Sequence, residues 1–209
     1  GIQKNGVSAC PKHFAANSQE LRRMASDSVM DERTLREIYL TGFEIAVKEG
    51  HAKSIMSSYN RVNGTYANEN KHLLQEILRD EWEFDGFVVS DWGGSNDHTA
   101  GVTAGSHLEM PTTGGDSDLE LVDAVKSGKL SEELLDRRVD ELLDVILSVT
   151  KAVKPLEGKS FDIEVHHAMA AKASEQSIVL LKNEGNILPL KKGAKVAVIG
   201  EFAQKARYQ

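Results

Sequence analysis

The feature that most constrains the fold is an alternation of short β-type runs with stretches of helical periodicity over about residues 1–130. This alternation is the pattern of successive βα units, which build a parallel sheet. The predicted strands are 7–10, 54–58, 86–90 and 106–110. Four such units are half of a (β/α)8 barrel, and half a barrel would expose unpaired strand edges. The alternation therefore predicts a half-barrel and an incomplete chain.

Amphipathic helices are predicted in the segments between these strands. Apolar residues recur at helical spacing from Leu35 to Ala46 and again from Leu73 to Trp82, and a shorter helix is predicted over 119–125. Ser131, followed by two glutamates, supplies a capping oxygen and negative charge at a helix start. The apolar positions from 134 to 147 continue that start as one strong amphipathic helix.

The composition changes at residues 154–162, where Pro155, Gly158 and mixed charges interrupt the pattern. We interpret this segment as a linker that separates a first domain, residues 1–153, from a second, residues 163–209. After it, the pattern predicts a helix from Ile163 to about Gln176 and an apolar strand over 196–199. The second domain would thus be the beginning of another α/β domain.

Charge and composition exclude several classes of protein. A net charge of -7 argues against a nucleic-acid partner, which usually requires a basic face. No apolar run reaches the roughly 20 residues of a membrane-spanning helix. The histidines lack the spacing of a metal site and the glycine pairs lack a nucleotide-binding motif, so neither metal nor cofactor is expected. Cys10, the single cysteine, is expected to be a buried structural side chain and favours a reducing cytoplasm.

Polar and aromatic residues follow each predicted strand, where parallel α/β proteins carry their functional side chains. Hydroxyl-binding and aromatic groups gathered at one barrel mouth suit a carbohydrate. An alternative for Asp91 alone is a turn residue that caps a helix. The strand-end segments are Pro11 to Asn17, Tyr59-Asn60, Asp91 to Gly94 and Glu109 to Pro111.

Several long motifs, in order and in register, closely resemble family 3 β-glucosidases over essentially the whole chain. The matching segments are Lys12 to Glu20, Asp31 to Leu40, Met56 to Asn60, Gly86 to Trp92, Leu108 to Pro111, Ser177 to Asn183 and Leu188 to Leu190. The resemblance implies the carboxyl-terminal half of the TIM-type barrel, a linker, and the start of an α/β sandwich domain. It also implies a retaining glycosidase that releases terminal β-linked glucose, or a similar sugar, without a cofactor.

The resemblance assigns roles to particular positions. Asp91 matches the nucleophile that forms the covalent glycosyl-enzyme. Lys12 and His13 match residues that bind sugar hydroxyls, and Tyr59 matches a tyrosine close to the nucleophile. Met56 and Trp92 match positions that line the same sugar subsite.

The match also implies what this chain lacks. In the β-glucosidase branch the acid/base residue comes from the second domain, beyond residue 209, and an aspartate and an arginine that bind the sugar belong to the first half of the barrel. We therefore expect the isolated chain to be inactive.

The sequence departs from the family pattern at two places. Ala15-Ala16-Asn17 replaces the histidine-containing loop of the β-N-acetylglucosaminidase branch, and His107 stands at a position where aspartate is common in the family. The first departure favours glucosidase or xylosidase chemistry.

Other functions stay open at this point. The chain could serve a β-xylosidase of the same family, or it could be a non-catalytic sugar-binding or structural fragment. Complementary chains of the same enzyme, or further copies of this one, could cover its open strand edges. Asn63-Gly64-Thr65 fits a glycosylation pattern, but Asn-Gly is also a favoured tight turn, which we expect here.

Overall fold

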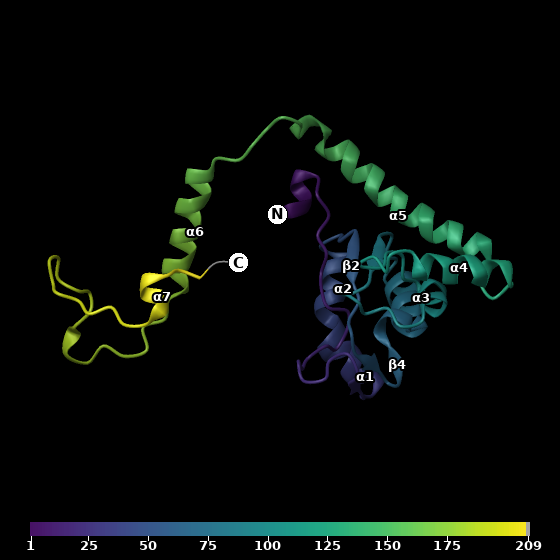
Figure 1. Ribbon diagram of the computed structural model, residues 1–209, viewed down its shortest axis with the longest axis horizontal. Coiled ribbons are helices and arrows are strands. Elements are labelled where there is room, and N and C mark those ends of the chain that lie inside the picture. The colour runs from purple at the N-terminus through teal and green to yellow at the C-terminus, as the bar shows by residue number, and fades with distance from the viewer. Residues whose placement is uncertain (208–209) are drawn as a thin grey trace. The chain divides into compact units, whose positions relative to one another are not determined.

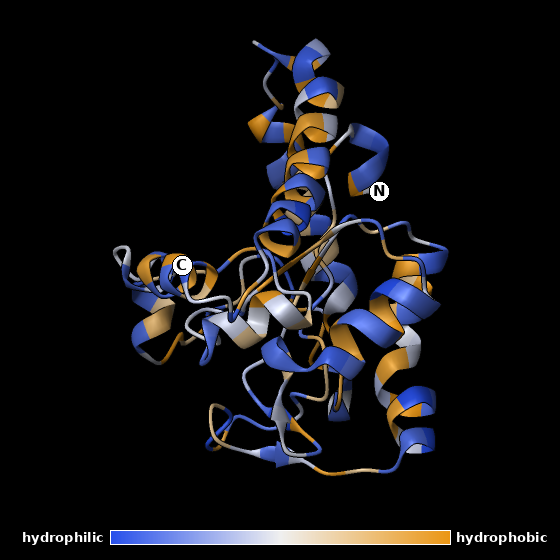
Figure 2. Cartoon of the chain, turned by 90° about the vertical axis from the view of Figure 1, so that its right-hand side faces the viewer, coloured by the Kyte–Doolittle hydropathy of each residue, from blue (hydrophilic) through white to orange (hydrophobic). Residues whose placement is uncertain are grey.

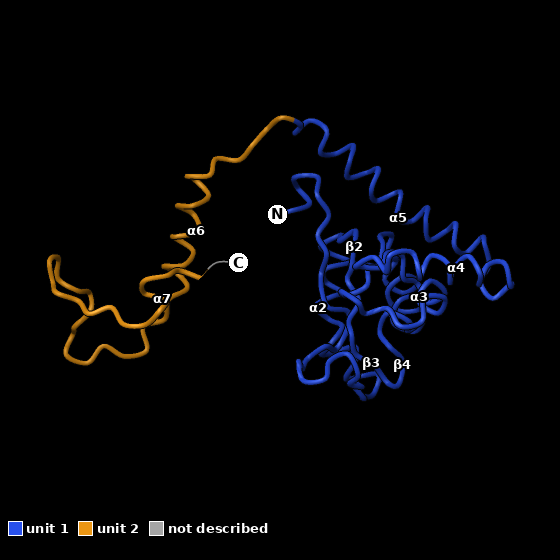
Figure 3. Tube along the Cα trace, viewed as in Figure 1, with its two compact units in different colours: residues 1–157 blue, residues 158–209 orange. Residues whose placement is uncertain are grey.

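The computed structural model describes residues 1–207 and divides into two compact units, one of residues 1–157 and one that begins at Gly158 (Figure 3). Among the described residues, all strands and the helices α1 to α5 belong to the first unit, and α6 and α7 belong to the second (Figure 1). The α/β part of the fold therefore lies within the first unit.

A short parallel ladder forms the centre of the first unit. Strand β2 (Ser54–Met56) pairs with β5 (Phe87–Val89), with Ser54 opposite Phe87 and Met56 opposite Val89. Isolated parallel bridges extend this ladder on both sides, from Phe14 to Ser57 and from Val89 to Leu108. Four chain segments thus lie side by side in sequence order, which is the arrangement that successive βα units produce.

The first of these segments joins the ladder later than the sequence predicted. Residues 7–10 form no strand, and the backbone bonds instead run from Met56 N to Pro11 O (3.1 Å) and from Phe14 N to Met56 O (2.8 Å). Cys10 precedes these bonds and is exposed, so the prediction that it is buried was wrong. Backbone pairing, rather than the apolar character of residues 7–10, decides where this segment is buried.

Helical segments connect the ladder segments, as the stripes predicted. The bounds are η1 Ile2–Asn5, α1 Glu32–Thr34, η2 Leu35–Leu40, α2 Thr41–Lys48, η4 His72–Glu81, α4 Asp116–Lys126, α5 Glu132–Val153 and η5 Lys154–Leu156. Leu35, Leu74 and Ile77 are almost completely buried in the core. Ile38 is 69% exposed although it belongs to the predicted stripe, because the wider π-helical turn of η2 shifts the phase of the helix.

Several elements were not predicted. Helix α3 (His98–Ala104) follows the nucleophile candidate, and η3 (Ala67–Glu69) precedes η4. A small second sheet joins β1 (Asp27–Ser28), β3 (Arg61–Val62) and β4 (Thr65–Tyr66). The expected turn at Asn63-Gly64 is confirmed, because it links antiparallel β3 and β4 and both residues have positive φ, at 51° and 93°.

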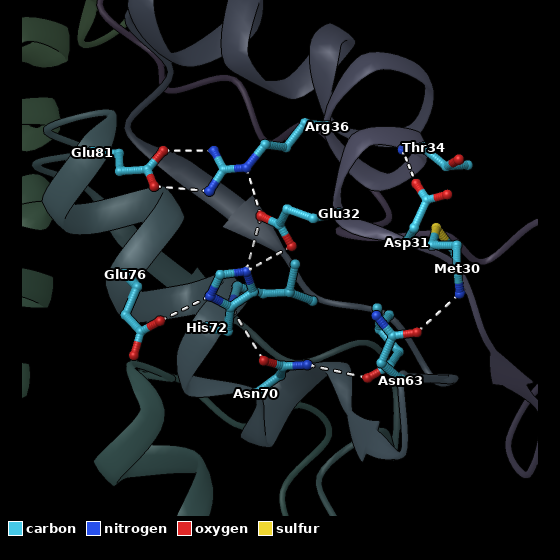
Figure 4. Close-up of polar contacts among 12 residues, drawn as sticks. Met30, Asp31, Glu32, Thr34, Arg36, Asn63, Asn70, His72, Glu76 and Glu81 are labelled. Atoms are coloured by element: carbon cyan, nitrogen blue, oxygen red, sulfur yellow. Dashed lines mark hydrogen bonds and ion pairs between the residues drawn. The ribbon is translucent and has the colours of Figure 1, made fainter.

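A surface network of charged residues joins the α1–η2 segment to η4 (Figure 4). Arg36 makes a bidentate ion pair with Glu81, at 2.6 and 2.8 Å, and His72 bonds both Glu76, at 2.8 Å, and Glu32, at 3.1 Å. The hydrogen bond to Glu76 is the main cause of the raised pKa of His72. These side chains are about one third to one half exposed, so the network contributes little stability compared with the core.

Apolar residues remain exposed on α5, where the helical ribbons in Figure 2 show hydrophobic bands between hydrophilic ones. Val139 is 46% exposed, Ile146 47% and Leu147 63%. The apolar stripe of α5 is thus only partly covered by the first unit.

No helix within residues 1–207 is long and apolar enough to cross a membrane.

The second unit contains α6 (Ile163–Ser177), η6 (Glu184–Asn186) and α7 (Glu201–Gln204). Helix α6 confirms the predicted helix and begins at Asp162, whose side chain accepts a hydrogen bond from Val165 N. The predicted strand at 196–199 does not form, and Ile199 is 90% exposed. A strand requires backbone partners, and no described residue of this unit supplies them.

Gly86 lies where the chain enters β5 and has no room for a side chain. An added Cβ would lie within 2.5 Å of the Lys53 carbonyl carbon, whose oxygen accepts the first ladder bond from Phe87 N. We expect Gly86→Ala to lower the free energy of unfolding by about 2 kcal/mol, measured by urea denaturation of the full-length protein. Gly42→Ala is the matched control, because Gly42 faces open space within α2. The control should raise stability by about 0.5–1 kcal/mol. Equal effects of the two changes would contradict the close approach at Gly86.

Candidate active site

Asp91 lies at the carboxyl end of the ladder, two residues after the end of β5. It is only 7% exposed. Its Oδ1 accepts a hydrogen bond from the Trp92 backbone N–H at 2.8 Å. Its Oδ2 is buried without a hydrogen-bond partner among residues 1–207. A buried carboxylate oxygen without a partner is unusual, and it is free to act on another molecule.

The backbone around Asp91 is fixed by a tight turn and by the neighbouring segment. Gly94 N donates to Asp91 O and Gly93 N to Met110 O, both at 2.8 Å. Ser90 bonds the same neighbour twice, since its hydroxyl donates to Met110 O at 3.2 Å and accepts from Met110 N at 2.9 Å. These bonds hold the carboxylate in one place at the edge of the ladder.

His13 approaches the Asp91 carboxylate. Its Nε2 lies 3.6 Å from Asp91 Oδ2, and its side chain is 31% exposed. The position follows from Phe14, which is fully buried and packs edge-on against Phe43 at 5.1 Å and Trp82 at 6.0 Å. The buried Phe14 ring therefore anchors the loop so that the preceding His13 reaches the carboxylate.

Tyr59 contacts the loop that follows Asp91. Its hydroxyl donates to Trp92 O at 2.8 Å, and its ring lies 3.3 Å from the position of a Cβ on Gly94. Burial raises the pKa of Tyr59, and the negative charge of Asp91 raises it further. Tyr59 consequently stays protonated at neutral pH and serves as a hydrogen-bond donor beside the carboxylate.

Of the remaining predicted residues, only Trp92 bonds Asp91 within the described chain, through its backbone N–H. Lys12 precedes His13 and is exposed, and its side chain makes no hydrogen bond or ion pair within the described chain. Met56 ends β2 and is half-buried between the backbone bonds to Pro11 and Phe14. The Trp92 side chain is 52% exposed, so its ring is available to a ligand. The structure thus brings His13, Tyr59 and the Trp92 backbone to Asp91.

Two residues near the site were not predicted. The Arg23 guanidinium lies over the Tyr59 ring, 4.6 Å from its centroid. Asn60 is 1% exposed and donates to Ala15 O at 3.1 Å, while its Oδ1 is buried without a partner in the described part of the chain. Arg23 is 36 residues from Tyr59 in sequence, and no local pattern connects them. The position of Asn60 just after a predicted strand was the only sequence feature that could have placed it near the site.

Glu109 and His107 belong to a separate region between the ladder and the helices. Glu109 bonds His98 Nε2 at 2.9 Å, and both line a cavity of about 230 Å³ that Asp91 does not line. His107 has a fully buried side chain and bonds Val88 N and Glu141. Neither residue therefore acts directly at Asp91, and the reading of Glu109 as a structural hydrogen-bonding residue is the one that the contacts favour.

A buried carboxylate between a histidine and a protonated tyrosine, beside an exposed tryptophan, can attack an electrophilic carbon of a ligand that stacks on the ring. Among residues 1–207, no group of three or more histidine, cysteine, aspartate or glutamate side chains could bind a metal ion.

Comparison with protein families gives a match over residues 1–145 to the N-terminal domain of glycosyl hydrolase family 3. The chain is 53% identical over 209 residues to the thermostable beta-glucosidase B of Acetivibrio thermocellus, covering 100% of this chain and 27% of that protein. It is 43% identical over 218 residues to an exo-alpha-(1->6)-L-arabinopyranosidase of Bifidobacterium longum, covering 100% of this chain and 28% of that protein. The chain thus spans about a quarter of the length of these curated relatives.

Solved structures give the same result. A beta-glucosidase of Bifidobacterium adolescentis has a TM-score of 0.87 at 42% identity, with 100% of this chain and 31% of that one covered. The beta-glucosidase 3B of Thermotoga neapolitana, solved in complex with alpha-D-glucose, has a TM-score of 0.82 at 43% identity, with 91% of this chain and 28% of that one covered. The family domain that matches residues 1–145 is a TIM-barrel type. From its motifs, its fold and these matches, the chain belongs to glycosyl hydrolase family 3.

Proposed function

We propose that this chain carries the nucleophile side of a retaining glycosidase that releases terminal β-linked glucose. The observation that supports this most is the Asp91 carboxylate, with one oxygen held by Trp92 N–H and the other buried and without a hydrogen-bond partner among the described residues. The glycosidases among the relatives support the reaction class. A nucleophile needs this combination of a fixed position and a free oxygen.

In the first step, Asp91 Oδ2 attacks the anomeric carbon of the bound sugar from the face opposite the leaving group. The new bond makes a glycosyl ester while the bond to the aglycone oxygen breaks, and that oxygen takes a proton from an acid/base residue outside this chain. In the second step, the same acid/base residue deprotonates a water, which attacks the anomeric carbon and releases the Asp91 carboxylate. Two inversions at one carbon retain its configuration.

The surrounding residues have separate roles in this proposal. His13 and Lys12 donate hydrogen bonds to sugar hydroxyls, and His13 also lies beside Asp91 Oδ2. Tyr59 holds the Trp92 carbonyl, so that the exposed Trp92 ring can lie against an apolar face of the sugar. Met56 completes the wall of the subsite at the end of β2.

The described fold supports a half-barrel reading of the first unit. Four ladder segments in sequential parallel order are half of those in a (β/α)8 barrel, and the uncovered apolar residues of α5 are consistent with missing neighbours. We place the barrel part at residues 1–153, the linker at 154–162, and the start of an α/β sandwich domain at 163–209. On this reading the isolated chain lacks the acid/base residue and part of the sugar pocket, and it is inactive until those parts are supplied.

A second substrate follows from the similarity to the arabinopyranosidase of Bifidobacterium longum. An α-L-arabinopyranoside differs from a β-glucoside in lacking the hydroxymethyl group. We therefore propose β-glucosides as the main substrates and α-L-arabinopyranosides as the alternative. Comparing kcat/KM for the two nitrophenyl glycosides on the full-length enzyme distinguishes them.

The decisive experiment is to trap the covalent intermediate. The full-length enzyme is incubated with a 2-deoxy-2-fluoro-β-glucoside that has a good leaving group, and its peptides are analysed by mass spectrometry. A label on Asp91 is the expected result, since the fluorine slows the second step more than loss of an activated leaving group. A label on another carboxylate would overturn the assignment of Asp91. Turnover without any trapped label would argue against a covalent mechanism.

A further inference from the structure

The loop between Asp91 and α3 carries Trp92 and has several anchors. Tyr59 Oη donates to Trp92 O at 2.8 Å, and Gly93 N donates to Met110 O at 2.8 Å. The far end of the loop reaches Asp97, whose side chain caps α3 by accepting from Ala100 N at 2.8 Å. The position of the Trp92 N–H that binds Asp91 Oδ1 therefore depends on how both ends of this loop are held.

Glu69 holds the far end of the loop. Its Oε1 accepts hydrogen bonds from two successive backbone groups, Asn96 N at 3.0 Å and Asp97 N at 2.8 Å. Glu69 is half-buried, and bonds from N–H groups to a carboxylate are stronger than neutral ones. One oxygen thus fixes two consecutive peptide groups of the loop.

The base of this anchor is itself rigid. The preceding residue, Asn68, is 1% exposed, and its Oδ1 accepts from Ser57 Oγ at 2.8 Å and from Ser106 Oγ at 3.0 Å. Ser57 follows β2, and Ser106 precedes the ladder residue Leu108. Asn68 therefore ties η3 to two ladder segments, and the next residue, Glu69, ties η3 to the loop of Asp91.

We infer that Glu69 is a positioning residue for catalysis, which fixes the Asp91–Asp97 loop and through it the Trp92 N–H and ring. This inference rests on the proposed function of Asp91. Glu69 does not touch the substrate in this account. It keeps the nucleophile and the aromatic platform in the geometry that the first chemical step needs.

The test uses the full-length enzyme and counts active sites. An activated dinitrophenyl 2-deoxy-2-fluoro-glucoside releases one dinitrophenol per competent site, so the rate of inactivation and of turnover can be expressed per site. We expect Glu69→Ala to lower both per-site rates by about tenfold to a hundredfold. Glu69→Gln keeps an amide oxygen where Oε1 lies, and it should stay within about threefold of the wild type.

Glu133→Ala is the matched control, because Glu133 is exposed on α5 and its side chain makes no hydrogen bond or ion pair within residues 1–207.

A purely structural role for Glu69 would reduce the number of competent sites and leave the per-site rate unchanged. Per-site rates of Glu69→Ala within about twofold of wild type, or equal losses in Glu69→Ala and Glu69→Gln, would overturn the inference. Should Glu69→Ala fail to fold, Glu69→Asp retracts the carboxylate by one methylene and is expected to show the same per-site loss. A wild-type enzyme that gives no label on Asp91 would instead refute the proposed function.

Discussion

Asp91→Gly is expected to reduce glycoside turnover by the full-length enzyme by on the order of 10⁴-fold or more, the scale seen when a covalent nucleophile is removed. The variant loses the carboxylate whose Oδ2 has no hydrogen-bond partner within the described chain, while His13 and Tyr59 remain in place. The measurement is kcat/KM for nitrophenyl β-glucoside. The binding of glucose itself should change far less than the turnover.

Azide provides a positive test of the same variant. The space left by the Asp91 side chain allows a small anion to attack the anomeric carbon of a glycoside with a good leaving group. Attack from that face gives a glucosyl azide of inverted, α configuration, which NMR can identify. Asp140→Asn is the matched control, since Asp140 is exposed on α5 and its side chain has no partner within residues 1–207. Activity of Asp91→Gly within about tenfold of the wild type would remove Asp91 from the mechanism.

Glu141→Leu is expected to give the largest loss of stability. Glu141 Oε2 bonds His107 Nε2 at 2.7 Å and Arg138 Nη1 at 2.9 Å, and Oε1 lies 3.4 Å from Arg79 Nη1. The side chains of Arg138 and Arg79 are 4% and 15% exposed, so the change leaves two buried cations without their carboxylate. Removing one partner of a buried ion pair costs about 3–5 kcal/mol, measurable by urea denaturation of the full-length protein.

The pH dependence of this loss follows from the pKa of Glu141. Burial acts to raise that pKa, but the hydrogen bonds from His107 and Arg138, with the nearby arginine charges, outweigh it and lower the pKa from 4.5 to about 2. A folded-state pKa below the unfolded value means that the unfolded chain binds more protons in this range. The contribution of Glu141 is therefore complete above pH 4.5 and is lost as the pH falls toward about 2.

The difference in stability between wild type and Glu141→Leu should accordingly narrow below pH 4.5. Burial also lowers the pKa of His107 from 6.5, so its charging in acid destabilises the wild type and the variant alike and does not cause this narrowing. Asp140→Leu is the control, since this exposed neighbour should change stability by no more than about 0.5 kcal/mol. A loss at Glu141 no larger than that of the control would show that the buried network contributes nothing.

The sequence by itself determined the local elements and the position of Asp91 just after a strand. The predicted helices formed as η4, α4, α5 and α6, and for η4 and α5 the apolar residues at helical spacing include positions that are buried in the structure. The position of Asp91 after an apolar strand was likewise visible, since the carboxyl ends of parallel strands lie together. The tight turn at Asn63-Gly64 was predicted because its backbone conformation depends on those two residues alone.

The tertiary structure alone decided which distant residues meet. Arg23 reaches the Tyr59 ring, and Glu69 reaches the loop of Asp91, across separations that no periodic pattern can express. From the sequence alone, His107 was only a departure from the aspartate that is common at this position in the family. The packing shows that it is a buried partner of Glu141. Residues 196–199 have the composition of a strand and do not form one, because the hydrogen bonds of a strand come from other segments and not from its own side chains.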